Sequence, residues 1–344
     1  MSDEPPYRVY RARPKLLARG DLGTERRGAT APRPRRRVTS GRVARWLVLG
    51  LIAWLAISVL AFLTSSLLQG DGVSDAAQAE LAGGSAGLLE PATVLLLGSD
   101  ARSAATAEPG SEGLSSRADS IMLMRVGGGA SARLSIPRDT LAEIPGRGRD
   151  KINAAYAQGG VALMVQAVEG LLGVQVDHAM LIDFERFPGL IDAMGGIDYT
   201  GGCVVSRING GARNGGVTLR LPAGTNHLTG KQALALARTR TNACRPNEDD
   251  RARARRQQKI VGAMRSRVLS PAGFVRLPRI AWATPRALRT DMGGPTLMGF
   301  ALGAVVSGDA DSRVLPVNAD PGGGTGLVVD EPRKARAVER FLAG

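Results

Sequence analysis

The densest group of side chains capable of chemistry lies between Arg238 and Gln258, where the sequence reads RTRTNACRPNEDDRARARRQQ. This segment contains seven arginines together with acidic residues, one cysteine and two glutamines. Guanidinium groups that converge on one place suit phosphate oxygens, because each can bind two oxygens at once. The same composition also fits a solvated basic surface, so the direction of each side chain decides between the two interpretations.

The residues that follow Asp250 have the spacing of a helix whose apolar side carries Ile260 and Met264. At about 100° per residue, three polar residues share this side: Asp250, Arg253 and Gln257. Because an unpaired buried charge is costly, we expect these side chains to be paired inside the protein. Three cations at i, i+4 and i+8 lie opposite and predict a solvated face: Arg251, Arg255 and Lys259.

Two further arginines come just before this helix. If the segment Arg238-Thr239-Arg240 is extended, both arginines point to one side and could hold a phosphate group together. For either arginine alone, a surface ion pair with a carboxylate is the competing interpretation.

Carboxylates accompany the ends of three short apolar runs. TVLLLG runs into Asp100, SIMLMRV follows Arg117 and Asp119, and ARLSIP runs into Arg138. Strand ends are where open α/β sheets build their sites, and two carboxylates plus substrate phosphates commonly hold Mg²⁺. Each acid–base pair alone fits a turn-stabilising ion pair. Together with the downstream arginines, they favour a magnesium-assisted phosphate site.

The elements that must position these residues alternate between strands and helices. We predict strands in TVLLLG, SIMLMRV, ARLSIP, VDHAMLIDF, GVTLRLPAG and RVLPV. Helical patterns occupy residues 152–173, 184–196, 228–238, 249–269, 294–306 and 331–344, and Thr229 with Gln232 predicts a capping box. This alternation predicts an α/β fold, an α/β/α sandwich with a central mixed sheet, over residues 92–344.

A single apolar stretch precedes this domain. Residues 1–45 carry 13 Arg and Lys against four acids and few large apolar residues, so we expect a disordered tail. Residues 46–68 carry no charge and are long enough to cross a bilayer as one transmembrane helix. The basic flank predicts a cytoplasmic N-terminus and an extracellular domain at the cell membrane, joined by a linker over residues 69–91. A cleaved signal peptide is the alternative, since SDAAQAE offers a cleavage site.

The only two cysteines are Cys203 and Cys244. Outside the cytoplasm such a pair predicts a disulfide, and two free thiols are the alternative. Two cysteines and two scattered histidines supply too few soft ligands for a zinc site.

Six blocks of this sequence, in order, resemble the LytR-CpsA-Psr family of cell-wall ligases. They are LLLGSDAR, RADSIML, SIPRDT, DKINAAYAQGG, LTGKQALALARTR and the D-x-x-R-x-x-R-Q-Q of residues 250–258. The resemblance covers at least Thr93 to Leu269. The abundance of arginine and the two cysteines are typical of members from high-GC Gram-positive (actinobacterial) species.

The resemblance implies a transferase that moves a glycopolymer from a polyprenyl (pyro)phosphate carrier onto peptidoglycan through a phosphodiester bond. It implies three groups of site residues. Asp100 and Asp119 would be Mg²⁺ ligands, and Arg138, Arg238 and Arg240 would hold the pyrophosphate. The remaining group would form the supporting and catalytic network: Arg117, Asp250, Arg253 and Gln257. A long lipid tail would also need an apolar tunnel near the membrane.

Two other functions stay open. A membrane-anchored, non-catalytic protein could bind or regulate anionic wall polymers with its basic face, but it would gain nothing from Asp100 and Asp119. A polyprenyl pyrophosphatase, with water as acceptor, would use the same residues. Nucleic acid is not an expected partner, because the domain lies outside the cell and aromatic residues make up only 4% of the chain.

Overall fold

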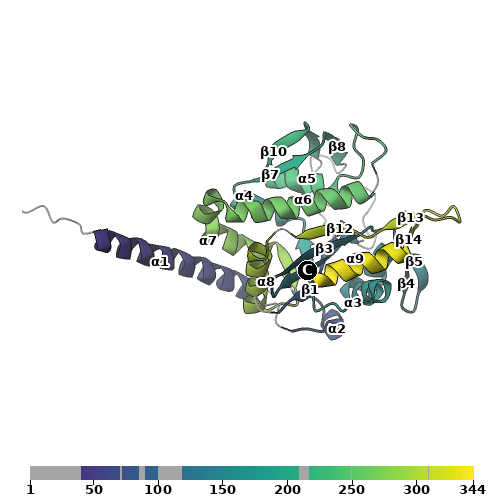
Figure 1. The fold of residues 1–344 in the computed structure, drawn as a ribbon, viewed down its shortest axis with the longest axis horizontal. Coiled ribbons are helices and arrows are strands. Elements are labelled where there is room, and N and C mark those ends of the chain that lie inside the picture. Colours follow the sequence, from purple (N-terminus) through teal and green to yellow (C-terminus); the bar gives the residue numbers. More distant parts are fainter. Residues whose placement is uncertain are drawn as a thin grey trace, which may run out of the picture. The chain divides into compact units, whose positions relative to one another are not determined.

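The computed structural model describes residues 40–69, 72–84, 90–99, 118–208, 217–248, 250–308 and 310–344. The chain divides into two units, Met1–Val48 and Leu49–Gly344. The described part of the first unit is the beginning of helix α1 (Ser40–Leu67), and the second unit contains the other described elements (Figure 1).

A six-stranded sheet forms the centre of the second unit, in the order β11-β6-β1-β2-β3-β12. Its strands are β1 (Ala92–Ser99), β2 (Ala118–Gly127), β3 (Ala130–Ile136), β6 (His178–Asp183), β11 (Leu288–Thr290) and β12 (Asp311–Val314). The pairs β1–β2, β2–β3 and β6–β11 are antiparallel, whereas β1–β6 and β3–β12 are parallel. The predicted mixed sheet is therefore confirmed.

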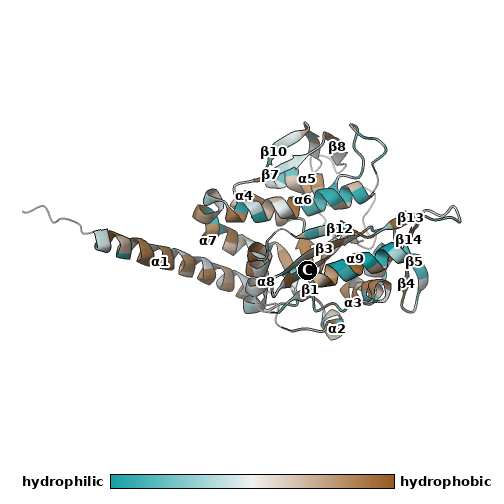
Figure 2. Ribbon diagram, viewed as in Figure 1, coloured by the Kyte–Doolittle hydropathy of each residue, from teal (hydrophilic) through white to brown (hydrophobic). Residues whose placement is uncertain are grey.

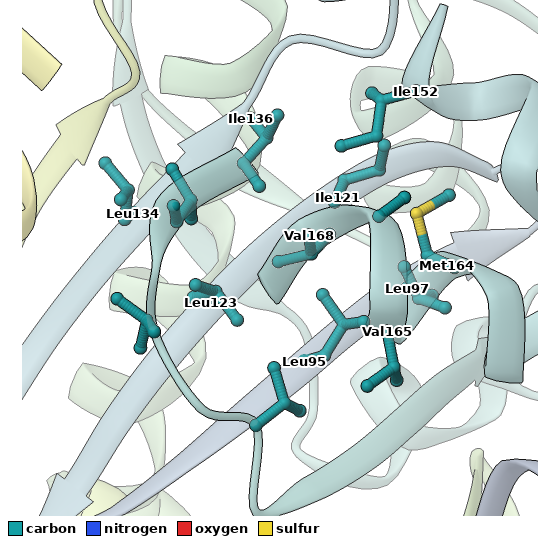
Figure 3. Close-up of a cluster of buried hydrophobic side chains, with 14 of the residues drawn as sticks. Leu95, Leu97, Ile121, Leu123, Leu134, Ile136, Ile152, Met164, Val165 and Val168 are labelled. Carbon is teal, nitrogen blue, oxygen red and sulfur yellow. The ribbon is translucent and has the colours of Figure 1, made fainter. Parts of the chain in front are cut away.

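One face of this sheet packs against three helices, α2 (Asp75–Glu80), α3 (Ile152–Leu172) and α9 (Glu331–Ala343). Alternate side chains of the strands point to this face because successive residues of a strand face opposite sides. Leu95 and Leu97 of β1 and Leu123 of β2 are fully buried there, together with Met164 and Val168 of α3 (Figure 3). This apolar layer fixes the sheet against α3.

The opposite face carries α6 (Asp250–Leu269), α7 (Pro271–Arg286) and α8 (Gly294–Val306). Here the intervening residues of the same strands, Leu96 and Met122, pack in one cluster with Leu297 and Phe300 of α8. Phe62 of α1 belongs to the same cluster. Helices on both sides of a mixed sheet confirm the predicted α/β/α architecture.

A second apolar cluster joins the helices to two small strand pairs. It contains residues of α4 (Phe187–Ala193), β7 (Ile197–Gly201), β8 (Val204–Ile208), β9 (Val217–Leu221), β10 (Gly224–Leu228) and α5 (Gly230–Arg238). The predicted capping box opens α5, since Thr229 Oγ1 accepts from the Gln232 amide and Gln232 Oε1 accepts from the Thr229 amide. This cap fixes where α5 begins. Arg238 is the last residue of the helix.

Helix α1 is long and apolar enough to cross a membrane, and it is the one helix of that kind among the described residues. It is apolar over most of its length (Figure 2). Within the second unit, Ser58, Phe62 and Ser65 are buried, and Ser65 donates a hydrogen bond of 2.7 Å to the carbonyl of Trp282. The helix begins at Ser40, before the apolar stretch.

Three local predictions differ from the structure. Part of the expected linker is folded: Ala77 of α2 is fully buried, and the amide of Ala82 donates to the carbonyl of Val176. Helix α7 was not predicted, because Pro278 and Pro285 inside it are ordinarily helix breakers. The single strand expected at RVLPV is two strands, since Pro316 has no amide hydrogen and separates β12 from β13.

The remaining strands form two small pairs beside the sheet. They are β4 (Leu141–Ile144) with β5 (Gly148–Lys151), and β13 (Val317–Ala319) with β14 (Leu327–Val329). Helix α3 is kinked at Gly159 and Gly160, where Gly160 has a φ of 64° that favours glycine.

Candidate functional site

The site is built where β1 and β2 reach the edge of the sheet. Their pairing shifts register between Gly98 and Ser99, which marks a bulge at the end of β1. A Cβ on Gly98 would come within 2.9 Å of Ser120 Cβ and 3.2 Å of the Phe184 ring, so only glycine allows this close approach. The bulge therefore brings β1, β2 and the end of β6 together.

The two predicted metal ligands follow this bulge in the sequence. Asp119 lies in β2, next to Ser120, but its side chain is outside the described residues, as are the whole of Asp100 and Arg117. Among the residues that the structure describes, no three His, Cys, Asp or Glu side chains could hold a metal ion together. Magnesium binding by Asp100 and Asp119 therefore stays a prediction.

Helix α6 directs two predicted site residues toward the protein. Arg253 is 4% exposed, and Gln257 is half-buried. Ser120 Oγ donates to Gln257 Oε1 at 2.8 Å, and Gln257 Nε2 donates to the carbonyl of Ala237 at 3.1 Å. The inward orientation expected from helical spacing is thus observed for both, whereas the side chain of Asp250 at the start of α6 is outside the described residues.

One residue of the expected solvated face is placed differently. Arg255 and Lys259 are exposed, as predicted, but Arg251 is half-buried and donates a hydrogen bond to the carbonyl of Val317. Strand β13 lies close to this side of α6, and an isolated helical pattern gives no sign of such a neighbour.

Two buried polar residues of α6 were not predicted. Arg256 forms an ion pair with Glu248 and donates to the carbonyl of Thr239 at 2.9 Å. Gln258 donates to Ser135 Oγ at 2.9 Å and to the carbonyl of Arg313 at 2.5 Å. Arg256 lies one turn before the buried Ile260, and this i, i+4 spacing was the signal that could have identified it.

The ion pair of Arg256 also affects a nearby phenol. Burial raises the pKa of Tyr199 above its usual value, the charge of Arg256 opposes that rise, and Glu248 adds to it. Tyr199 is 3% exposed and therefore stays protonated at neutral pH. It is a structural residue of the second cluster.

The three predicted phosphate-binding arginines occupy different settings. Arg238 is the last residue of α5, and its guanidinium lies 5.8 Å from the centre of the Phe184 ring. Arg240 is exposed beyond the C-cap Thr239, so the condition under which both arginines would point to one side, an extended segment from Arg238 to Arg240, is not met. Arg138 Nε lies 3.5 Å from Asp139 Oδ2, and Lys151 shares the same carboxylate at 3.3 Å.

An apolar cavity of about 380 Å³ extends from this edge of the sheet between the sheet and the helices of the second face. Its lining is dominated by apolar side chains, among them Leu96, Met122, Met124, Met180, Ile182 and Phe300. Ser120, Gln257 and Phe184 belong to the same lining, whereas none of the predicted phosphate-binding arginines, Arg138, Arg238 and Arg240, is among its described residues. The structure thus joins an apolar space to the polar groups at the end of β2.

The two cysteines are linked, which confirms the predicted disulfide. The Cα atoms of Cys203 and Cys244 are 6.0 Å apart. Buried Asn242 reinforces the link: its Oδ1 accepts from the amides of Val205 and Cys244, and its Nδ2 donates to the carbonyl of Cys203. The loop between Arg240 and α6 is therefore fixed to the beginning of β8.

Similar proteins are known for most of this chain. The model of the LytR_cpsA_psr family matches residues 75–330. Regulatory protein MsrR of Staphylococcus aureus (strain COL) is 27% identical over 263 residues, which cover 73% of this chain and 74% of MsrR. Polyisoprenyl-teichoic acid–peptidoglycan teichoic acid transferase TagU of Bacillus cereus (strain AH820) is 35% identical over 179 residues, or 51% of this chain and 52% of TagU.

A solved structure has the same fold. The crystal structure of TagV from B. subtilis has a TM-score of 0.59 and 24% identity, covering 74% of this chain and 97% of TagV. At this identity the likeness concerns the fold alone. The family match, in contrast, extends from α2 to the residue before α9 and includes the strand ends, helix α6 and the part of the cavity lining that lies outside α1. The chain belongs to the LytR_cpsA_psr family.

Proposed function

We propose that this protein transfers a glycopolymer from a polyprenyl (pyro)phosphate carrier onto peptidoglycan through a phosphodiester bond. The observation that carries the proposal is the apolar cavity with polar groups at the sheet edge. An isoprenoid tail needs an apolar space, and its phosphates need cations and hydrogen-bond donors beside that space. TagU, similar to about half of this chain, is by name a teichoic acid transferase.

The predicted site residues would have distinct roles in the proposed transfer. A sugar hydroxyl of the acceptor attacks the phosphorus that carries the glycopolymer, and the bond from that phosphorus to the carrier phosphate breaks. Arg138, Arg238 and Arg240 would bind the phosphate oxygens, while Arg117 and the buried Arg253 would stabilise the negative charge that develops. Gln257, fixed by Ser120 and Ala237, would orient the reacting phosphate, and Asp250 would support this network.

Magnesium fits the chemistry of the predicted donors, because the carboxylates of Asp100 and Asp119 would be hard oxygen ligands. The pairing of the end of β1 with the beginning of β2 supports this proposal, because Asp100 follows β1 in the sequence and Asp119 belongs to β2. When bound, the ion would neutralise phosphate charge.

Helix α1 indicates where the protein would act, which is at a membrane. Its length and composition are those of a single-pass membrane anchor, and Leu55 and Phe62 of α1 line the same cavity as the sheet residues. An anchor that borders the cavity would keep its apolar interior beside the lipid carrier. We propose that the domain lies outside the cell, where peptidoglycan is available as acceptor.

A transfer reaction in vitro tests this function. The full chain in detergent would be mixed with a radiolabelled, polyprenyl-pyrophosphate-linked saccharide and uncross-linked peptidoglycan, with and without Mg²⁺. We expect label to become attached to peptidoglycan and to resist mild washing. Free labelled saccharide phosphate without attachment would identify a pyrophosphatase, and unchanged carrier would identify a passive binder; either outcome would overturn the proposal.

A further inference from the structure

A second concave space lies on another side of α6 from the apolar cavity. This groove, of about 590 Å³, is formed by α6, by the segment from β12 to β13, and by α9. Six arginines line it: Arg251, Arg255, Arg313, Arg333, Arg336 and Arg340. Its described lining includes no acidic residue and shares no residue with the apolar cavity, so it is a separate site.

Half of these arginines are uncompensated within the described part of the chain. Arg255, Arg336 and Arg340 make no hydrogen bond or ion pair there, and all three are exposed. Arg313 and Arg333, in contrast, are paired with Asp311 at 2.8 Å and Asp330 at 3.4 Å. Like charges gathered in one concave space repel one another, and a bound anion would remove that repulsion.

The arginines form two rows rather than one cluster. Arg251 and Arg255 are four residues apart on α6, a rise of about 6 Å. On α9, Arg336 and Arg340 follow Arg333 by three and seven residues, so the row rises by about 10 Å. Such rows suit a chain with repeated anionic groups better than a single small anion.

The floor between the rows has a different chemistry. It is formed by the segment from Val314 to Val317, which presents apolar side chains and backbone groups. Arg251 is held toward this floor by its hydrogen bond to the carbonyl of Val317. An apolar floor between cationic rows fits a chain whose uncharged units alternate with charged ones.

We propose that this groove binds a polyanionic chain with regularly spaced phosphate groups, and that the arginines of α6 and α9 bind these phosphates. A guanidinium group can bind two oxygens of a carboxylate or of a phosphate, but phosphate offers acceptors in more directions and therefore suits arginines that come from two helices. The inference goes beyond the proposed transfer, because the groove holds such a chain whether or not a reaction occurs in the other site.

Polyanion binding to the full chain in nanodiscs of neutral lipid tests this inference. The probes are fluorescently labelled linear polyphosphate, polygalacturonate as a carboxylate polymer, and neutral dextran. Two variants with equal loss of charge are compared: Arg255→Gln/Arg336→Gln/Arg340→Gln in the groove, and Arg220→Gln/Arg279→Gln/Arg289→Gln at exposed arginines elsewhere. Thermal unfolding of both variants checks that they are folded.

We expect polyphosphate to bind more tightly than polygalacturonate and dextran not to bind. The groove variant should bind polyphosphate at least about tenfold more weakly, and the control variant less than about twofold more weakly. Equal weakening in both variants, tighter binding of polygalacturonate, or no binding of polyphosphate would each overturn the proposal. Polyphosphate binding that persists while no label is transferred to peptidoglycan would overturn the proposed transfer and leave the groove, so the two failures are distinguished.

Discussion

The hydroxyl of Ser120 donates a hydrogen bond of 2.8 Å to Oε1 of Gln257, joining the end of β2 to the inward face of α6. The amide of Gln257 is also held, because it donates to the carbonyl of Ala237 at 3.1 Å. A side chain fixed at both ends keeps one orientation, and this one lies on the lining of the apolar cavity. In the proposed function, this fixed amide would orient the reacting phosphate.

Gln257→Ala should lower the transfer rate by on the order of 10², since fixed dipoles at a reacting centre commonly contribute this much. The stability of the fold should change little, because the residue is only half-buried. Lys259→Ala, two residues further on the exposed side of α6, is the matched control and should keep the rate. Equal rates for the two variants would remove Gln257 from the site.

Arg256→Ala should destabilise the protein by about 3–5 kcal/mol, because it leaves the partner of a buried ion pair uncompensated. Arg255→Ala removes the neighbouring, exposed arginine and should cost less than about 0.5 kcal/mol. Urea unfolding of the full chain in detergent measures both. A similar loss in the two variants would mean that Arg256 is not buried with Glu248.

Removal of the disulfide by Cys203→Ser/Cys244→Ser should lower the free energy of unfolding by about 4 kcal/mol for a sequence separation of 41. The hydrogen bonds of Asn242 should keep the loop close to β8, so some transfer should persist. Intact-mass measurement after alkylation checks the link itself. Two alkylated cysteines in unreduced protein would contradict it.

Stability should fall as pH rises through the raised pKa of His178. Burial disfavours the charged imidazole, but the hydrogen bond to Asp291 at 2.5 Å and its charge outweigh burial and raise the pKa of His178 above 6.5. The folded state therefore binds the proton more tightly, and this contribution is complete below pH 6.5 and lost above the raised pKa. Unfolding by urea as a function of pH measures it.

Two variants isolate this effect. His178→Asn removes the titrating group and Asp291→Asn removes the charge that stabilises its protonated form, so each should flatten the decline in stability above pH 6.5. If the free energy of unfolding declines with pH in both variants as it does in the unaltered protein, groups other than His178 cause the decline.

Short apolar runs and local spacing predicted much of this fold and part of the site. The runs that became β1, β2 and β3 are bounded by glycine and polar residues, and the cap at Thr229 is a purely local interaction. The inward positions of Arg253 and Gln257 followed from 3.6-residue periodicity, because one face of α6 meets the core. Such features depend on residues that are close together in the sequence, so one sequence is enough to predict them.

Features that depend on distant segments could not be predicted in this way. Arg251 is drawn inward by β13, which is about sixty residues away in sequence. Helix α7 contains two prolines and is held by packing of Ile280 in the second cluster, which overrides its poor local propensity. Helix α2 has only six residues and gains its stability from the burial of Ala77.

Native mass spectrometry of the full chain, purified from membranes in mild detergent, tests directly whether the apolar cavity holds a lipid carrier. We expect a bound lipid that fragments to a polyprenyl phosphate. Ala281→Trp, which fills part of the apolar cavity, should lose this lipid, whereas Ala335→Trp on the exposed side of α9 should keep it. The absence of a lipid phosphate from the unaltered protein, or its undiminished retention by a folded Ala281→Trp variant, would contradict the assignment of the cavity to the carrier.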